Sequence, residues 1–332
     1  MNRIGVRALA TGLGSALGLV LALGALIGCS GNGPSAVRHD PPARRTNAAV
    51  NPNPALPGRD LTKARDGSGD LRRVHFASKA LGRPDSYLIY LPPGYSRLAK
   101  AGTRFPVLYL LHGDGRHQRH GAGHLFQRGR IGRAASALTE AGRLAPMLIV
   151  IPEATDRSVV GDTEWANTSR GRFASDVIDL TRSVDRTWPT VGSRAGRAIA
   201  GLSMGGYGAV NIALRHLGLF STVESWSGYF TQTPTGPFAG ASRAALRVNS
   251  PASYVGGLRA QLAADPIHVL LYASPTDPLH VQQAPFAASL RSLGVPVETR
   301  LFGGPHNFAL WADHMGLALS FAGHWLSNGG GA

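Results

Sequence analysis

The sequence predicts an α/β fold in which a mostly parallel central sheet carries helices on both faces. From Leu71 onward, short apolar runs alternate with helical stretches and turn residues, which is typical of such a fold. Runs such as FPVLYLL at Phe105–Leu111 are apolar throughout, as expected of buried strands. With 43% hydrophobic and 16% charged residues, the 332-residue chain can form a sizeable core. Because α/β folds of about 250 residues often form one unit, we expect a single folded domain at 71–328.

The strands and helices follow one another along this domain. We expect strands at Arg72–Ser78, Ser86–Leu91, Phe105–Leu111, Met147–Ile151, Arg197–Gly201, Thr222–Trp226, Ile267–Ala273 and Val297–Phe302. We expect helices at Arg128–Ala141, Phe173–Trp188, Met204–His216, Val281–Leu293 and Phe308–Leu326. In the last helix, the spacing of Trp311, Met315, Leu319 and Trp325 predicts one apolar side.

Residues 1–29 have the pattern of an export signal. Arg3 and Arg7 precede an apolar run that ends in LIGC, with Cys29 as its last residue. These four letters resemble the bacterial lipobox, which implies that Cys29 carries a lipid and that residues 1–28 are removed. The alternative is an uncleaved signal anchor, since the run nearly reaches the roughly 20 residues that span a bilayer. Either way the folded domain lies outside the cytoplasm, anchored to the outer face of the cytoplasmic membrane or cell envelope, or secreted. Cys29 is the only cysteine, so no internal disulfide is expected.

Two further features concern tethering and charge. Residues 30–70 are rich in Pro, Gly, Asn and Ser and predict a flexible tether. The net charge of +15 is compatible with binding to nucleic acid or to an anionic envelope surface. The arginines are scattered and no nucleic-acid-binding motif accompanies them, so we expect no nucleic-acid partner.

The segment Gly201-Leu202-Ser203-Met204-Gly205 fits the pattern G-x-S-x-G. An apolar strand leads into it and a helix rich in small residues follows, which predicts a sharp strand-to-helix turn with Ser203 as nucleophile. Side chains at 201 and 205 would crowd this turn. The N–H of Met204 begins the helix, where unpaired N–H groups and the helix dipole favour an oxyanion.

A serine nucleophile needs a base and an acid that orients the base. His306 lies in the glycine-rich loop between the last strand and the last helix, where the base is expected. The other histidines after Ser203 lie within or at the ends of helices and strands. Asp277 follows the strand at 267–273 and is the leading acid. Asp277 before Pro278 also fits a helix N-cap, a role expected to compete with catalysis. Two other acids are alternatives. Asp265 precedes the strand at 267–273 and so lies at its wrong end, and Glu298 lies within the last strand.

The loop after the strand at 105–111 begins His112-Gly113-Asp114-Gly115. Its glycines allow a backbone N–H, that of Asp114, to serve as the second oxyanion donor. The plain alternative is an ordinary turn. Four histidines lie close together in this segment: His112, His117, His120 and His124. Their spacing does not place them on one face of a helix, so we expect a mobile loop and no metal site.

Taken together, these motifs resemble the esterase D-related branch of the α/β hydrolases. This group includes enterochelin, feruloyl and acetylxylan esterases, S-formylglutathione hydrolases and mycobacterial mycolyltransferases. The resemblance covers residues 72–327 and depends on FPVLYLLHG at 105–113, GLSMGGYGA at 201–209, YASPTDP at 272–278 and GGPHNFALW at 303–311. It implies an α/β-hydrolase fold, a triad of Ser203, Asp277 and His306, and an oxyanion hole formed by the amides of Asp114 and Met204.

Three functions follow as hypotheses. The first is hydrolysis of a carboxylic ester, carbohydrate- or lipid-linked esters included, through an acyl-enzyme on Ser203. The second is acyl transfer, in which a sugar or lipid hydroxyl takes the acyl group. The third is a non-catalytic envelope-binding protein on the same scaffold. No cofactor is expected, since a triad needs none.

Overall fold

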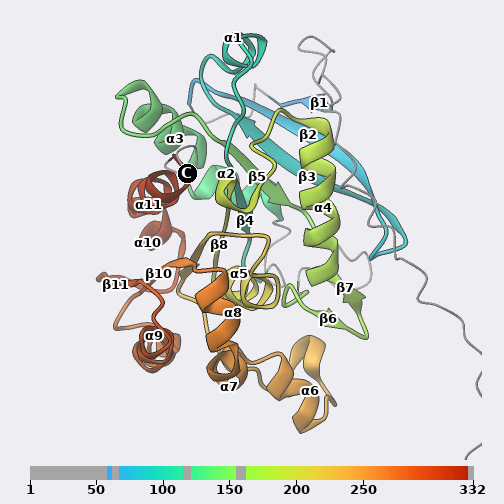
Figure 1. Ribbon diagram of the computed structural model, residues 1–332, viewed down its shortest axis with the longest axis vertical. Coiled ribbons are helices and arrows are strands. Elements are labelled where there is room, and N and C mark those ends of the chain that lie inside the picture. The colour runs from blue at the N-terminus through green and yellow to red at the C-terminus, as the bar shows by residue number, and fades with distance from the viewer. Residues whose placement is uncertain (1–57, 62–66, 115–120, 155–161, 328–332) are drawn as a thin grey trace, which may run out of the picture. The chain divides into compact units, whose positions relative to one another are not determined.

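A nine-stranded sheet runs through the residues that the computed structural model describes, which are 58–61, 67–114, 121–154 and 162–327 (Figure 1). Its strands lie in the order β1-β2-β3-β5-β4-β8-β9-β10-β11. They are β1 (Arg59–Asp60), β2 (Asp70–Ser78), β3 (Arg83–Leu91), β4 (Val107–Leu111), β5 (Leu148–Pro152), β8 (Arg197–Leu202), β9 (Thr222–Trp226), β10 (His268–Ala273) and β11 (Val297–Leu301). The pairs from β5 to β11 are parallel, and those from β1 through β3 to β5 are antiparallel.

All eight predicted strands are confirmed, with boundaries within three residues of those expected. The central strands β4, β5, β8 and β9 are buried at every position, which explains their continuous apolar runs. At the sheet edge, Arg59 and Asp60 pair with β2, although the sequence placed them in the tether. A small separate hairpin, β6 (Asn167–Thr168) and β7 (Gly171–Arg172), was not predicted.

The helices agree with the sequence where they are long. Helices α4 (Phe173–Thr187) and α5 (Met204–Arg215) end one residue before the predicted limits. The helix predicted at 281–293 is a 3₁₀ turn, η5 (Pro278–Gln282), followed by α9 (Gln283–Ser292). Five short helices were not expected: α1 (Tyr95–Lys100), α2 (Ala122–Arg128), α6 (Arg243–Val248), α7 (Pro251–Tyr254) and α8 (Arg259–Ala264).

The helix predicted at 128–141 begins three residues later, as α3 (Ile131–Glu140). It is separated from the preceding α2 at Arg130, which adopts a φ of 50°. The helix predicted at 308–326 is divided into α10 (Phe308–Asp313) and α11 (Met315–Ser327), which are separated at His314. Trp325, expected on the apolar side of that helix, is only half-buried and stacks on the His268 ring with centroids 3.4 Å apart.

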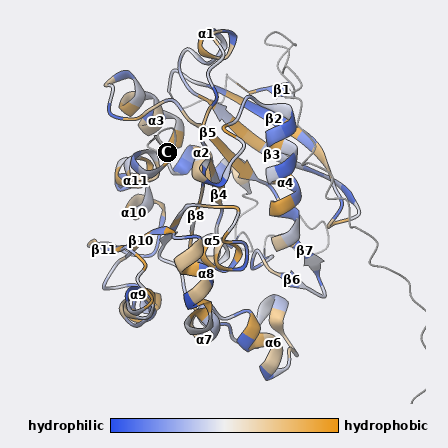
Figure 2. Ribbon diagram, in the orientation of Figure 1, coloured by the Kyte–Doolittle hydropathy of each residue, from blue (hydrophilic) through white to orange (hydrophobic). Residues whose placement is uncertain are grey.

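The sheet separates two hydrophobic cores. One includes Val177 of α4, Ile212 of α5 and Phe286 of α9. The other includes Ile131 of α3 and Met315 of α11. Figure 2 shows hydrophobic central strands and helices of mixed hydropathy, as expected when each helix buries only one face. A fully buried side chain of this size contributes about 1.5–3 kcal/mol, so the two cores hold the strands in a fixed order.

This order brings the carboxyl ends of the parallel strands to one edge of the sheet. The chain leaves β4 at Leu111, β8 at Leu202, β10 at Ala273 and β11 at Leu301. Ligand sites of open α/β sheets form at this edge. Every residue proposed from the sequence for catalysis follows one of these four strand ends.

Among the described residues, no helix is both long and apolar enough to cross a membrane. The predicted export signal, Cys29 and most of the predicted tether lie outside the described residues.

Candidate active site

Ser203 occupies a strained turn between β8 and α5. Its backbone φ of 55° and ψ of −121° are unusual for a residue other than glycine. A Cβ at Gly201 would lie 2.3 Å from the carbonyl oxygen of Gly205, and one at Gly205 would lie 2.2 Å from that of Leu111. The predicted steric reason for both glycines is therefore confirmed.

Ser203, His306 and Asp277 form a continuous chain of hydrogen bonds. The hydroxyl of Ser203 donates to Nε2 of His306 over 2.9 Å. Nδ1 of His306 donates to Oδ2 of Asp277 over 2.6 Å. The Asp277 side chain is 1% exposed and the His306 side chain is 30% exposed. The row of hydrogen bonds therefore runs from the protein interior at Asp277 towards the pocket. The structure thus brings together the three side chains singled out from separate loops.

Asp277 also caps the 3₁₀ turn η5. Its Oδ1 accepts the N–H of Leu279 over 2.9 Å, while Oδ2 contacts His306. The expectation that capping competes with the contact to the base is therefore wrong. Each carboxylate oxygen has its own partner, and the cap fixes the orientation of the oxygen that faces the imidazole.

The loops that carry Asp277 and His306 are tied together by Thr276. Its hydroxyl donates to the carbonyl oxygen of Gly304 over 2.8 Å. On the other side of the base, the Trp311 indole meets the His306 ring edge to face at 5.0 Å. Trp311 in turn donates from Nε1 to Oγ of Ser227 over 3.2 Å. The sequence did not predict the contacts of Thr276 and Trp311. A threonine next to an aspartate and a tryptophan in a short helix are common in proteins and do not by themselves indicate such contacts.

The two residues expected to supply oxyanion donors both lie beside Ser203. Met204 is the first residue of α5, and its N–H belongs to the helix end. The loop after β4 passes close to Ser203, since a Cβ at Gly113 would lie 3.4 Å from Cβ of Ser203. Asp114 follows in the same loop and lines the same pocket as Ser203.

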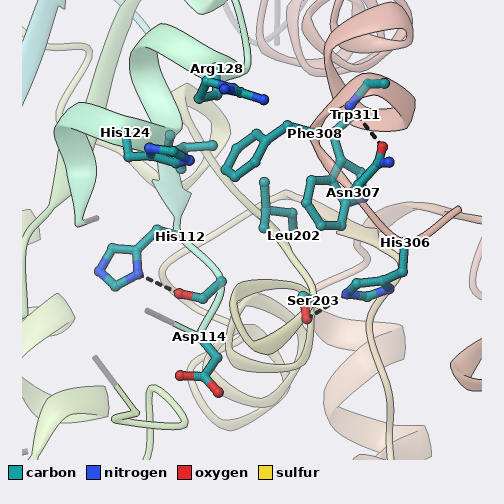
Figure 3. A pocket seen from close by; sticks show the side chains of 13 residues that line it. His112, Asp114, His124, Arg128, Leu202, Ser203, His306, Asn307, Phe308 and Trp311 are labelled. Atoms are coloured by element: carbon teal, nitrogen blue, oxygen red, sulfur yellow. Dashed lines mark hydrogen bonds between the residues drawn. The ribbon is translucent and has the colours of Figure 1, made fainter. Parts of the chain in front are cut away.

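His112 orients the peptide between Gly113 and Asp114. Its Nδ1 lies 2.8 Å from the carbonyl oxygen of Gly113. The C=O and N–H of a trans peptide point in opposite directions. The N–H of Asp114 therefore points away from the His112 ring, on the side where Ser203 lies in Figure 3. This role of His112 was not predicted.

The His112 ring is itself held on two sides. Nε2 lies 3.0 Å from the carbonyl oxygen of Glu153, and Trp165 packs edge-on at 4.8 Å. Trp165 also donates from Nε1 to the carbonyl oxygen of His112 over 2.9 Å. Both ring nitrogens thus face backbone carbonyl oxygens, so the ring is fixed from both sides.

A cavity of about 670 Å³ opens in front of Ser203. It is lined by His112, Gly113, Asp114, His124, Leu125, Arg128, Leu202, Ser203, His306, Asn307, Phe308, Ala309 and Trp311. Figure 3 shows Phe308, Leu202 and Asn307 between Arg128 and Ser203. Among the four clustered histidines, His117 and His120 lie outside the described residues, and His124 packs against Phe308 with ring centroids 4.7 Å apart. In the described ranges, no three His, Cys, Asp or Glu side chains gather as metal ligands would.

Carboxylates gather on the Asp114 side of the site. Glu164 accepts the Tyr229 hydroxyl over 2.5 Å and the Gln232 amide over 2.8 Å. Burial raises the pKa of Glu164, and the nearby charges of Asp162 and Asp114 raise it further. Glu164 adopts a φ of 49°, so the fold holds it in place at a conformational cost. No motif in the sequence pointed to this cluster.

Residues 78–316 match the family described as putative esterase. Among curated proteins, 159 residues are 29% identical to an endo-1,4-beta-xylanase/feruloyl esterase of Xylanibacter ruminicola, a match over 46% of this chain and 20% of that protein. A 160-residue match to an esterase of Mycobacterium tuberculosis is also 29% identical and covers 46% of this chain and 31% of that one. The chain thus spans less than a third of the length of either curated relative.

A solved structure of a ferulic acid esterase superposes with a TM-score of 0.68. The superposition covers 78% of this chain and 99% of that one, at 24% identity. At this identity the likeness shows the fold alone, and the chemistry has to be argued from the side chains.

Proposed function

Because the chain belongs to the putative esterase family and has the α/β-hydrolase fold, we propose that it is a serine hydrolase of carboxylic esters. Ser203 is the nucleophile, His306 the general base and Asp277 the acid that orients it. The observation that carries the proposal is the unbroken chain of hydrogen bonds from Ser203 through His306 to Asp277. A serine on a strained turn, with a base in contact and an orienting carboxylate behind it, is what acyl transfer to serine requires.

In the acylation step, Nε2 of His306 takes the proton of Ser203 as Oγ attacks the ester carbonyl carbon. The tetrahedral oxyanion accepts hydrogen bonds from the N–H groups of Met204 and Asp114. Asp277 stabilises the imidazolium that forms. The intermediate then expels the alcohol, which receives the proton from His306, and Ser203 is left as an ester.

In the deacylation step, His306 removes a proton from water, and the hydroxide adds to the acyl-enzyme carbonyl. The second tetrahedral intermediate collapses, the carboxylic acid leaves, and Ser203 regains its proton. A sugar or lipid hydroxyl in place of water would give acyl transfer by the same steps.

The test is to purify the full chain in mild detergent beside Ser203→Ala and to assay both on 4-nitrophenyl esters of increasing chain length. Each assay is repeated with a sugar acceptor, and both proteins are treated with a fluorophosphonate that labels active serines. We expect turnover and labelling of the wild type only. Equal activity of both proteins would exclude Ser203 as nucleophile. Acceptor-dependent ester product would indicate a transferase, and inertness in both assays would favour a non-catalytic binding protein.

We further propose that the protein is exported and anchored through lipidated Cys29. The support is the LIGC segment at the end of the apolar run. Cells that express the wild type or Cys29→Ser, grown with an alkyne-tagged fatty acid, provide the test. Label and membrane association are expected in the wild type and loss of the label in the variant. Equal labelling of the two would contradict lipidation at Cys29.

A further inference from the structure

One wall of the cavity in front of Ser203 is cationic. Arg128 lies in the last turn of α2, and His124 lies one turn earlier on the same helix. Residues four apart share a helix face, and both of these line the cavity. Phe308 of α10 packs between them. The Arg128 guanidinium carbon is 6.0 Å from the centre of the Phe308 ring, and the His124 ring meets that ring edge to face. We call Arg128, His124 and Phe308 the basic wall (Figure 3).

Within the described part of the chain, Arg128 has no carboxylate partner, and its guanidinium packs over the Phe308 ring. Its neighbour Arg130 differs, because it pairs with Asp313 at 4.0 Å and does not line the cavity. Arg73 likewise pairs with Glu153. A guanidinium that packs over an aromatic ring keeps its in-plane N–H groups free to bind an anion in bidentate fashion.

The opposite side of the cavity has the opposite charge. Asp114 lines the cavity, and its carboxylate lies on the far side from Arg128 in Figure 3. Glu164 lies near enough to both Asp114 and Asp162 for its charge to interact with theirs. An anionic group on a substrate would be repelled from this side and attracted to the basic wall. The net charge of +15 also favours the approach of anions.

We propose that the substrate is an ester that carries a second, anionic group, and that Arg128 binds this group while the ester carbonyl lies at Ser203. The anion belongs either to the acyl part or to the alcohol part, and the apolar stretch between the two groups rests on Phe308 and Trp311. This inference rests on the proposed esterase function and adds a class of substrate to it.

The first test compares two acyl chains of equal length. Mono-4-nitrophenyl adipate carries a terminal carboxylate, and 4-nitrophenyl hexanoate does not. For the wild type and Arg128→Gln we would measure the ratio of kcat/KM for the anionic ester to that for the neutral one. A charge-assisted hydrogen bond contributes enough binding that we expect this ratio to fall about tenfold or more in the variant, mainly through KM. Arg128→Lys is expected to fall between the two, because it keeps the charge and loses the planar fork.

Arg130→Gln is the matched control. It removes the same charge two residues along the chain, from a side chain that pairs with Asp313 and does not line the cavity. Its ratio is expected to stay within twofold of the wild-type ratio. If the two glutamine variants lower the ratio equally, net charge and not the basic wall is responsible, and the proposal fails.

The second test moves the charge to the alcohol part. The butyrate ester of 4-hydroxybenzoate is compared with the butyrate ester of methyl 4-hydroxybenzoate on the same proteins. If the ratio of kcat/KM for the anionic ester to that for the neutral ester depends on Arg128 in one of the two tests, that test identifies which part of the substrate carries the anion. If the ratio depends on Arg128 in neither, the inference is overturned even though the esters are hydrolysed. If the wild type cleaves no ester and the fluorophosphonate does not label it, the proposed function itself is wrong.

Discussion

Asp277 contacts His306 through one carboxylate oxygen only, with 2.6 Å between Oδ2 and Nδ1. The other oxygen accepts the N–H of Leu279, so the side chain is fixed from both sides. The same residue thus begins a 3₁₀ turn and orients the His306 imidazole, the proposed base. These two roles are separable by substitution, because they need different properties of the side chain.

Asp277→Asn is expected to abolish most activity while leaving the fold intact. Asparagine caps a helix start about as well as aspartate, but it cannot stabilise the imidazolium. We expect kcat to fall by about 10⁴-fold, the size of the effect known for such an exchange in a serine protease triad. Asp277→Ala should lose activity similarly and about 1 kcal/mol of stability in addition. Ester kinetics and urea unfolding of both variants provide the measurement. Equal stability of the two variants would show that the cap is unimportant.

His112→Gln is expected to lower kcat with little change in KM. The ring holds the Gly113 carbonyl and thereby directs the Asp114 N–H, which in the proposed mechanism stabilises the oxyanion of the transition state. Loss of one oxyanion donor lowers kcat by about 10²–10³-fold, so misdirecting it should lower kcat by up to that factor. His75→Gln, in an exposed position of β2, is the control for the exchange itself. A change confined to KM would argue against an effect on the oxyanion.

Gly205→Ala is expected to destabilise the fold, because its new methyl group would lie 2.2 Å from the Leu111 carbonyl oxygen. The backbone oxygen of His112 would lie only 2.7 Å away as well. Because both contacts are with backbone atoms at the end of β4, which cannot easily move aside, the free energy of unfolding should drop by about 1–3 kcal/mol or more. At Gly123 of α2, a Cβ meets no atom within 4 Å. Gly123→Ala should therefore be neutral or stabilise by up to about 1 kcal/mol. Thermal unfolding of the pair checks this, and a stable Gly205→Ala protein would mean that the turn relaxes.

The stability of the protein should depend on pH through Asp176 of α4. Burial, together with the nearby charge of Asp85, raises the pKa of this carboxyl from 3.8 to about 7. Between pH 4 and pH 7 the folded protein therefore binds a proton at Asp176 that the unfolded chain has lost. The contribution of Asp176 to stability is thus fully present below about pH 4 and is lost as the pH rises to about 7.

Asp176→Asn removes this titration without changing the shape of the side chain. We expect the difference in unfolding free energy between the variant and the wild type to change by up to about 1.4 kcal/mol per pH unit in this window. Urea unfolding at pH 4, 5, 6 and 7 measures it. Asp313→Asn, at an exposed position, should follow the wild-type curve. Parallel curves for Asp176→Asn and the wild type would contradict the role of Asp176.

The predicted strands were confirmed because burial on both faces requires apolar residues at successive positions, a pattern visible within one short segment. The helix at 308–326 was predicted as continuous because its apolar spacing continues across the break, and the helix at 128–141 was predicted to begin three residues too early. The observed boundaries depend instead on single residues. Arg130 adopts a left-handed conformation, and His314 stacks on Phe302 with ring centroids 3.5 Å apart. Neither property shows in local periodicity.

The sequence by itself determined the order of the strands along the chain, the glycine-lined turn at Ser203 and the loops that hold Asp277 and His306. Each of these is set by the physical needs of a short segment, such as a close backbone approach at Gly205 or the end of a buried strand. Only the tertiary structure decided how side chains from different loops meet. It divided the Asp277 carboxylate between two partners, turned the Gly113 carbonyl towards His112 and placed Phe308 beside Arg128. Such contacts depend on the packing of distant segments around the sheet, which no local pattern of residues encodes.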